Sequence, residues 1–114
     1  MKYSKEFVLE LYRKMKLIRC FEECVKRDHL AHEIKGPAHL YIGEEAIATG
    51  ICAALRKDDQ IESTHRGHGH CIAKGADIKG MMAEIYGKGA GLCSGRGGSM
   101  HIADFSVGML GANG

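Results

Sequence analysis

The first regular pattern of apolar positions lies near the start of the chain. Apolar residues recur every three or four positions over residues 7–25, which is the spacing of one face of an α-helix. Ser4 can cap this helix, and Glu6 places a negative charge in its first turn, where it stabilises the helix dipole. A weaker helical pattern continues over residues 26–34, and the glycine and proline at 36–37 predict a stop. We expect one long N-terminal helix that bends or breaks in its second stretch.

Three shorter elements follow. Small and aliphatic residues recur with helical spacing over residues 44–56, so we expect a helix whose small side chains allow close backbone approach. Asp58 and Asp59 predict a turn, and the stretch 60–65 with its β-branched residues predicts a short extended segment. Asp77 can cap a last helix that ends at Gly87.

A glycine-rich stretch comes after that helix. Five of the ten residues 89–98 are glycine, and such a run loses too much conformational entropy to sit in a helix or strand. Neither the glycine spacing of a dinucleotide-binding fingerprint nor that of a P-loop is present. We expect a functional loop that leads into the sequence SMHIADF.

Length and charge narrow the class of protein. At 114 residues the chain is one domain at most, and 16 Lys and Arg against 14 Asp and Glu give a net charge of only +2. No basic face for nucleic acid is visible. The start of the chain mixes charges through its apolar positions, unlike a signal peptide, and no apolar run reaches about eighteen residues. We expect a soluble, cytoplasmic protein with no nucleic-acid or membrane partner.

Cysteine and glycine usage adds two expectations. The five cysteines are an odd number without a CxxC pair, which indicates reduced and mostly buried thiols. The chain has 16 glycines, no tryptophan and the ending VGMLGANG, without a closing element. We expect something to cover or continue that end.

The densest candidate chemistry is the stretch STHRGHGH. His65, His68 and His70 suggest a metal site, but the permanently charged Arg66 lies among them and repels a divalent cation. Arg66 and the exposed amides of the two intervening glycines fit an anion such as phosphate or diphosphate better. A surface turn with merely solvated histidines remains the third interpretation.

Two further histidines are candidates for proton transfer. His39 precedes the helix expected at 44–56 and is by itself more typical of a structural residue than of a catalyst. His101 follows the glycine loop and could serve as an acid, a base or an anion donor.

Several ordered motifs together resemble one family. The segments IRCFEE, HLYIGEEA, STHRGHGHCIAKGAD, GRGGSMHIADF and GANG, in this order, resemble the N-terminal third of the α subunit of thiamine-diphosphate-dependent 2-oxo acid dehydrogenases, the E1 component. The resemblance covers residues 7–114. It is strongest to the acetoin dehydrogenase branch, with the pyruvate dehydrogenase E1 α subunit next.

The resemblance implies roles for particular residues. His65 and Arg66 match the pair that holds the cofactor diphosphate, although the family often has tyrosine at the first position. Asn113 and Gly114 match the start of a segment whose backbone contacts the cofactor aminopyrimidine. His39 matches a histidine near the reacting centre, so we take His39, together with His101, as the catalytic candidates.

The resemblance also implies a fold and partners. It predicts the α/β thiamine-diphosphate-binding fold, with residues 1–114 forming the helical N-terminal part of a single domain that stops before the Mg²⁺–diphosphate motif. No metal ligand is therefore assigned in this chain. The implied partners are an E1 β subunit in a two-α, two-β heterotetramer, a lipoyl-bearing E2 acyltransferase and a small-molecule substrate, either acetoin or a 2-oxo acid such as pyruvate.

Two other classes stay open at this stage. The chain could be an inactive fragment or a stand-alone anion-binding or regulatory domain. It could also be a structural metal-binding protein that uses the three clustered histidines.

Overall fold

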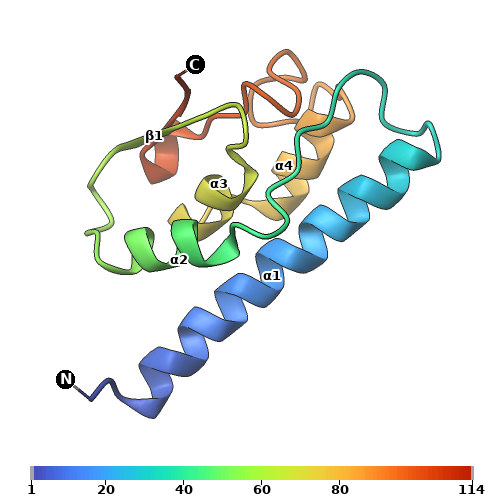
Figure 1. Cartoon of the computed structure of the whole chain (residues 1–114). Coiled ribbons are helices and arrows are strands. Elements are labelled where there is room, and N and C mark those ends of the chain that lie inside the picture. Colours follow the sequence, from blue (N-terminus) through green and yellow to red (C-terminus); the bar gives the residue numbers. More distant parts are fainter. Residues whose placement is uncertain (1, 114) are drawn as a thin grey trace.

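The longest element of the computed structural model is the helix α1 (Lys5–Leu30), against one side of which the rest of the chain packs (Figure 1). The structure describes residues 2–113. The side chain of Ser4 caps α1 as expected, accepting a hydrogen bond from the amide of Phe7 at 3.1 Å. The expected break is confirmed, because α1 stops at Leu30, inside the stretch 26–34, although the weaker helical pattern ran on to residue 34. After α1 the chain turns back, and this turn inserts Ile34, only 3% exposed, into the core.

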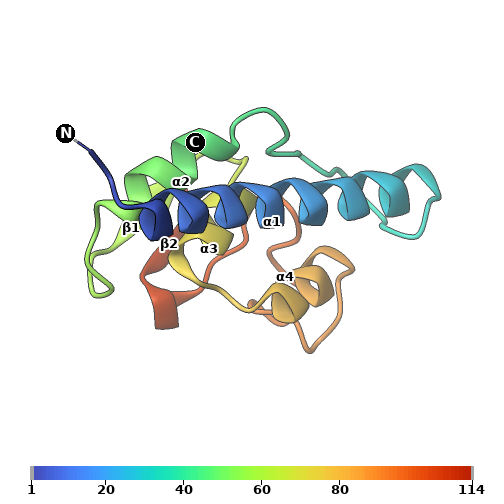
Figure 2. The same cartoon turned by 90° about the horizontal axis from the view of Figure 1, so that it is seen from below.

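Three short helices pack beside α1. These are α2 (Glu45–Ala53), α3 (His68–Lys74) and α4 (Ile78–Ile85). In the view from below, α2 and α4 lie to either side of α1, with α3 between them (Figure 2). The cap predicted for the last helix is confirmed, since Asp77 accepts from the amide of Gly80 at 2.8 Å. The observed helix is four residues shorter than the expected span 44–56, because Glu44 and Ala54 are its caps.

Two short strands form a parallel pair. Strand β1 (Ile61–Ser63) confirms the extended segment predicted before the histidine cluster, and it pairs with β2 (Met109–Ala112), which the sequence pattern did not indicate. Ile61 lies opposite Met109, and Ser63 lies opposite Ala112. The connection between them carries α3, α4, the glycine loop and a short 3₁₀ helix, η1 (Phe105–Val107). This pairing brings the end of the chain back to the start of the histidine cluster.

The core forms where one face of α1 meets α2, α3 and α4. α1 contributes three apolar side chains that are at most 6% exposed, at the helical spacing predicted from the sequence. The fully or nearly fully buried apolar residues include Ile18, Phe21, Val25, Ala48, Cys71, Ile72, Met81, Ile85, Ile102 and Met109.

The thiols are less buried than expected. All five cysteines are free, but only Cys71 is buried, and Cys20 is exposed. The expectation of mostly buried thiols is therefore wrong. Cys20 lies between the core positions Ile18 and Phe21 in sequence, off the buried stripe of α1, and lines an open hollow between α1 and α4.

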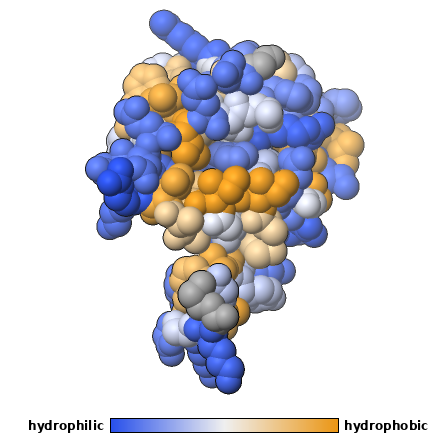
Figure 3. Space-filling model, turned by 60° about the vertical axis from the view of Figure 1, so that its left-hand side comes forward, coloured by the Kyte–Doolittle hydropathy of each residue, from blue (hydrophilic) through white to orange (hydrophobic). Residues whose placement is uncertain are grey.

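The surface has one conspicuous apolar feature. Figure 3 shows a band of apolar side chains on the face from which the N-terminal end of α1 projects. Ile47 and Ile51 of α2 are among the exposed apolar residues, at 54% and 52%. Within residues 2–113, no helix combines the length and apolar character that a membrane crossing requires.

Candidate functional site

A three-residue segment at positions 39–41 is held by three separate parts of the chain. The amide of His39 donates to Ser99 Oγ at 2.9 Å. The carbonyl of Leu40 accepts from Arg66 Nη1 at 2.6 Å. The amide of Tyr41 donates to Glu22 Oε2 at 3.0 Å. These partners come from the end of the glycine loop, the turn after β1 and the centre of α1. The backbone on which His39 sits is thus fixed in position by long-range contacts.

The ring of His39 meets the ring of His65. Their centroids are 4.9 Å apart and the planes cross at 85°, so an edge of one ring faces the other. Nδ1 of His39 is buried and has no hydrogen-bond partner in the described part of the chain. Burial, together with the electrostatic effect of the neighbouring His65, Arg66 and His68 side chains, holds the pKa of His39 below its ordinary value. The structure therefore brings His39, His65 and Arg66 into one cluster.

His68 is buried and has both ring nitrogens engaged. Nδ1 lies 2.6 Å from Glu22 Oε1, and Nε2 lies 3.0 Å from Ser99 Oγ and 3.1 Å from Ser99 O. Neither nitrogen is available to a metal ion unless one of these contacts breaks. His68 instead joins α1, α3 and the glycine loop.

His70 is also held by neighbouring side chains. Its Nδ1 lies 3.0 Å from Ser63 Oγ. Its ring meets the Tyr41 ring edge-on, with the two ring centroids 5.2 Å apart. Within residues 2–113, no group of three or more His, Cys, Asp or Glu side chains is arranged to hold a metal ion. The geometry thus favours the interpretation in which His68 and His70 shape the site through hydrogen bonds.

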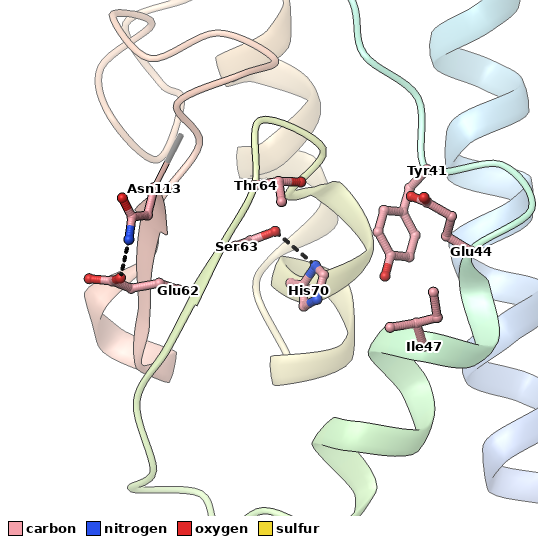
Figure 4. Close-up of a pocket in the computed structure, with 8 residues that line it drawn as sticks. All are labelled: Tyr41, Glu44, Ile47, Glu62, Ser63, Thr64, His70 and Asn113. Carbon is pink, nitrogen blue, oxygen red and sulfur yellow. Dashed lines mark hydrogen bonds between the residues drawn. The ribbon is translucent and has the colours of Figure 1, made fainter.

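A cavity of about 470 Å³ lies beside the cluster (Figure 4). Tyr41 and the start of α2 form one wall, and residues 62–64 with Asn113 form the other. Asn113 is placed by the strand pairing, since its amide donates to Ser63 O at 2.6 Å and its side chain donates to Glu62 Oε2 at 3.2 Å. The lining residues are Tyr41, Glu44, Ile47, Glu62, Ser63, Thr64, His70 and Asn113.

One predicted site residue, His101, lies apart from the cluster of His39, His65 and Arg66. His101 is exposed, and within residues 2–113 no hydrogen bond or ring contact joins its side chain to the His39–His65 pair. Its main chain bonds locally, with its amide donating to Gly97 O at 3.2 Å. Gly114 lies outside the described residues.

Three acidic or hydroxyl residues that organise the site were missed from the sequence. Glu22, Ser99 and Glu84 are each at most 4% exposed and each accepts backbone hydrogen bonds. For Glu22 a signal existed, because it lies four residues after Ile18 and three before Val25, on the apolar face of α1. An acid on such a face is buried, and a buried acid needs hydrogen-bond partners.

Comparison of the sequence with known proteins shows the family of this chain. The model of the dehydrogenase E1 component family matches residues 13–114. The chain therefore belongs to this family, as the ordered motifs predicted.

Individual relatives point in the same direction. The chain is 60% identical, over 111 residues, to the α subunit of an acetoin:2,6-dichlorophenolindophenol oxidoreductase from Bacillus subtilis, covering 97% of this chain and 33% of that protein. It is also 60% identical over 111 residues to the protein of the same description from Cupriavidus necator, with the same coverage. The pyruvate dehydrogenase E1 component subunit alpha of Rhizobium meliloti is 46% identical over 100 residues, 88% of this chain and 29% of that protein. The chain thus spans about a third of the length of these relatives.

Proposed function

We propose that residues 1–114 form the N-terminal part of a single thiamine-diphosphate-binding domain in the α subunit of a cytoplasmic E1 dehydrogenase. The substrate is acetoin or a 2-oxo acid such as pyruvate, and the acyl unit passes to lipoamide or a dye. Family membership and the two relatives at 60% identity support this reading. Acetoin is the first candidate substrate because both of those relatives are named for it.

The observation that carries the proposal is the convergence of His39, His65 and Arg66. A guanidinium and two imidazoles lie together where the turn after β1 meets segment 39–41. Arg66 uses Nη1 for the carbonyl of Leu40, and a guanidinium has further N–H donors for an anion. A diphosphate fits this set chemically, because the nearby groups are cationic or hydrogen-bond donors.

The proposed roles follow from position. His65 and Arg66 bind the diphosphate, while His39, whose buried Nδ1 has no described partner, faces the reacting end and exchanges a proton there. Asn113 and Gly114 lie at the aminopyrimidine end. Thiamine diphosphate, when bound, supplies the carbanion chemistry that cleaves the bond beside the carbonyl. His101 is kept as a second proton-transfer candidate that would act from the glycine loop.

The Mg²⁺ that accompanies the diphosphate is assigned to residues outside this chain. The carboxylates of Asp59, Asp77 and Asp104 are already engaged, with Arg56, with the amide of Gly80 and with Ser106. Asp58 lies on the same exposed turn as Asp59 and pairs with Arg56 at 3.7 Å. The proposal therefore includes partners: further α-subunit sequence, a β subunit in a two-α, two-β assembly, and a lipoyl-bearing E2 acyltransferase.

The test is Arg66→Ala in a protein of the relatives' full length, assembled with its β subunit. Loss of a charged hydrogen bond to phosphate costs ~1.5–3 kcal/mol, so thiamine diphosphate affinity should fall by about 10- to 100-fold. Arg13→Ala is the matched control, because Arg13 is exposed on α1 and bonds only to Glu10 among the described residues. Unchanged affinity in the Arg66 variant would remove the diphosphate assignment.

A second variant tests the histidine of the pair. His65→Tyr restores the residue that the family often carries and keeps a hydrogen-bond donor. Affinity should be retained within about threefold, because the phenol still donates a hydrogen bond to the diphosphate. A large loss of affinity would mean that His65 acts in another way.

A further inference from the structure

Glu84, at the end of α4, is a fully buried carboxylate surrounded by backbone amides. Oε2 accepts from the amides of Cys93 and Gly95 at 2.7 and 2.8 Å, and Oε1 accepts from those of Gly97 and Gly98 at 2.7 and 3.1 Å. Its exposed fraction is 0%. One side chain thus satisfies four main-chain donors of the glycine loop.

The conformation in which the loop surrounds Glu84 requires glycine at two positions. A Cβ added at Gly97 would lie 2.5 Å from His101 O, and one added at Gly95 would lie 2.6 Å from the carbonyl carbon of Gly87. Gly95 also has a positive φ of 76°. The glycines at 95 and 97 are therefore required by close backbone approach, which no other residue permits without a shift.

The four hydrogen bonds from the loop require Glu84 to be ionised. Burial by itself would raise the pKa of the Glu84 carboxyl, but the hydrogen bonds from the loop amides outweigh it and lower the pKa below its ordinary value. A glutamine has one acceptor oxygen, and its NH₂ group would point donors at two of the four amides. Only an ionised carboxylate accepts all four.

The loop ends in the residue that holds His39. Ser99 follows Gly98 directly and is 4% exposed. Its Oγ accepts from the amide of His39 at 2.9 Å and lies 3.0 Å from Nε2 of His68. The carboxylate of Glu84 is therefore connected to the hydroxyl that fixes His39 by one hydrogen bond, to the amide of Gly98, and by the peptide bond from Gly98 to Ser99.

We propose that Glu84 is a positioning residue for His39: by fixing the glycine loop it places Ser99, and Ser99 holds the backbone of His39 so that its ring stays packed edge-on against that of His65. The catalytic part of this inference rests on the role proposed above for His39. The structural part, that Glu84 controls the environment of His39, stands independently.

The first experiment measures the structural part on the whole chain by NMR, with Glu84→Gln. The amides of residues 93, 95, 97 and 98 should exchange with solvent at least about tenfold faster. The contact between the His39 and His65 rings should weaken, and the pKa of His39 should rise toward its ordinary value as its ring becomes hydrated. Glu23→Gln, an exposed acid on α1, is the matched control and should change none of these.

Ser99 variants separate the link from general loosening of the fold. Ser99→Ala should change the titration and ring contact of His39 while leaving amides 93–98 protected, and Ser99→Thr, which keeps the hydroxyl, should restore His39. These variants also decide the question if Glu84→Gln does not fold. If Glu84→Gln speeds exchange of the loop amides but leaves the ring contact and pKa of His39 unchanged, Glu84 has only a local role and the proposal is overturned. The proposal is also overturned if Ser99→Ala leaves the ring contact and pKa of His39 unchanged.

The second experiment concerns catalysis in the full-length enzyme with its β subunit. Glu84→Gln should lower kcat by about tenfold or more while thiamine diphosphate affinity changes by less than about threefold, since among the described residues neither Glu84 nor Ser99 hydrogen-bonds to Arg66, which keeps its own bond to Leu40 O. Equal losses in both quantities would point to general unfolding and count against positioning. If Arg66→Ala leaves affinity unchanged, the cofactor assignment fails, but the NMR result for Glu84 still stands or falls separately.

Discussion

Nδ1 of His68 lies 2.6 Å from Oε1 of Glu22, and both side chains are fully buried. The second carboxylate oxygen of Glu22 accepts from the amide of Tyr41. One acid on α1 thus fixes both α3, through His68, and the segment that carries His39. The stability of the fold and the geometry of the candidate site depend on the same contact.

Glu22→Gln should lower the free energy of unfolding by ~1–3 kcal/mol, the cost of leaving a buried polar group without its partner. The amide retains one acceptor but turns donors toward His68 or Tyr41. Urea unfolding followed by circular dichroism measures the effect. Glu23→Gln, its exposed neighbour in sequence, should change stability by less than ~0.5 kcal/mol. Equal effects of the two substitutions would show that the buried contact contributes little.

Gly69→Ala should be destabilising because a Cβ at this position would overlap the ring of Tyr41. Forcing that ring aside costs ~1–3 kcal/mol, as overpacking generally does. Gly50→Ala is the matched change, since Gly50 lies inside α2 with nothing within 4 Å of an added Cβ. That variant should gain ~0.5–1 kcal/mol from helix propensity. Thermal unfolding should therefore shift in opposite directions for the two variants.

The ion pair between Arg19 and Glu45 should make stability depend on acid pH. The hydrogen bond from Arg19, assisted by the amide of Gly43, outweighs burial and lowers the pKa of Glu45 to about 2. A lowered carboxyl pKa contributes stability that is complete above the unfolded-state value and is lost as the pH falls through the folded-state value.

Glu45→Gln should therefore be less stable than the native chain by ~1–2 kcal/mol near neutral pH. The difference should shrink as the pH falls from about 4.5, the ordinary value, toward about 2. Urea midpoints across this range measure it. A difference that stays constant down to pH 2 would contradict the lowered pKa.

The five thiols should react in order of exposure. Cys20 should be alkylated first, and Cys71 last, because Cys71 is 0% exposed and burial raises its pKa to about 12. Mass spectrometry of the folded chain after brief alkylation near neutral pH gives the order. In strong denaturant the order should disappear, and early labelling of Cys71 in the folded chain would mean that α3 opens readily.

Local patterns predicted the elements that depend on neighbours in sequence. The cap by Ser4, the cap by Asp77 and the extended segment before the histidine cluster were all correct, because each depends on residues within one or two turns. The end of α1 was misplaced because burial of Ile34, a tertiary effect, decides where the chain turns back. Strand β2 was missed since its register comes from pairing with β1 across the crossover connection.

The candidate site was predicted in a similar way. Charge alone argued against metal at the histidine cluster, and the contacts of His68 with Glu22 and Ser99 agree with that argument. The pairing of His39 with His65 had no local signal, since the two residues are far apart in sequence and meet only when segment 39–41 packs against the turn after β1. The role of Glu84 was invisible for the same reason, although its place on the apolar face of α4 beside Met81 and Ile85 marked it as buried.

The cradle around Glu84 also bears on the order in which the chain folds. Its hydrogen bonds span only 9 to 14 residues, whereas His68 to Ser99 spans 31 and His39 to Ser99 spans 60. Closing a loop costs more entropy as it lengthens, by roughly 0.6 kcal/mol for each doubling. We therefore expect the glycine segment to close early on its own carboxylate. Ser99 is then already in place when the longer loops to His68 and His39 close, and the longest of these, to His39, closes last.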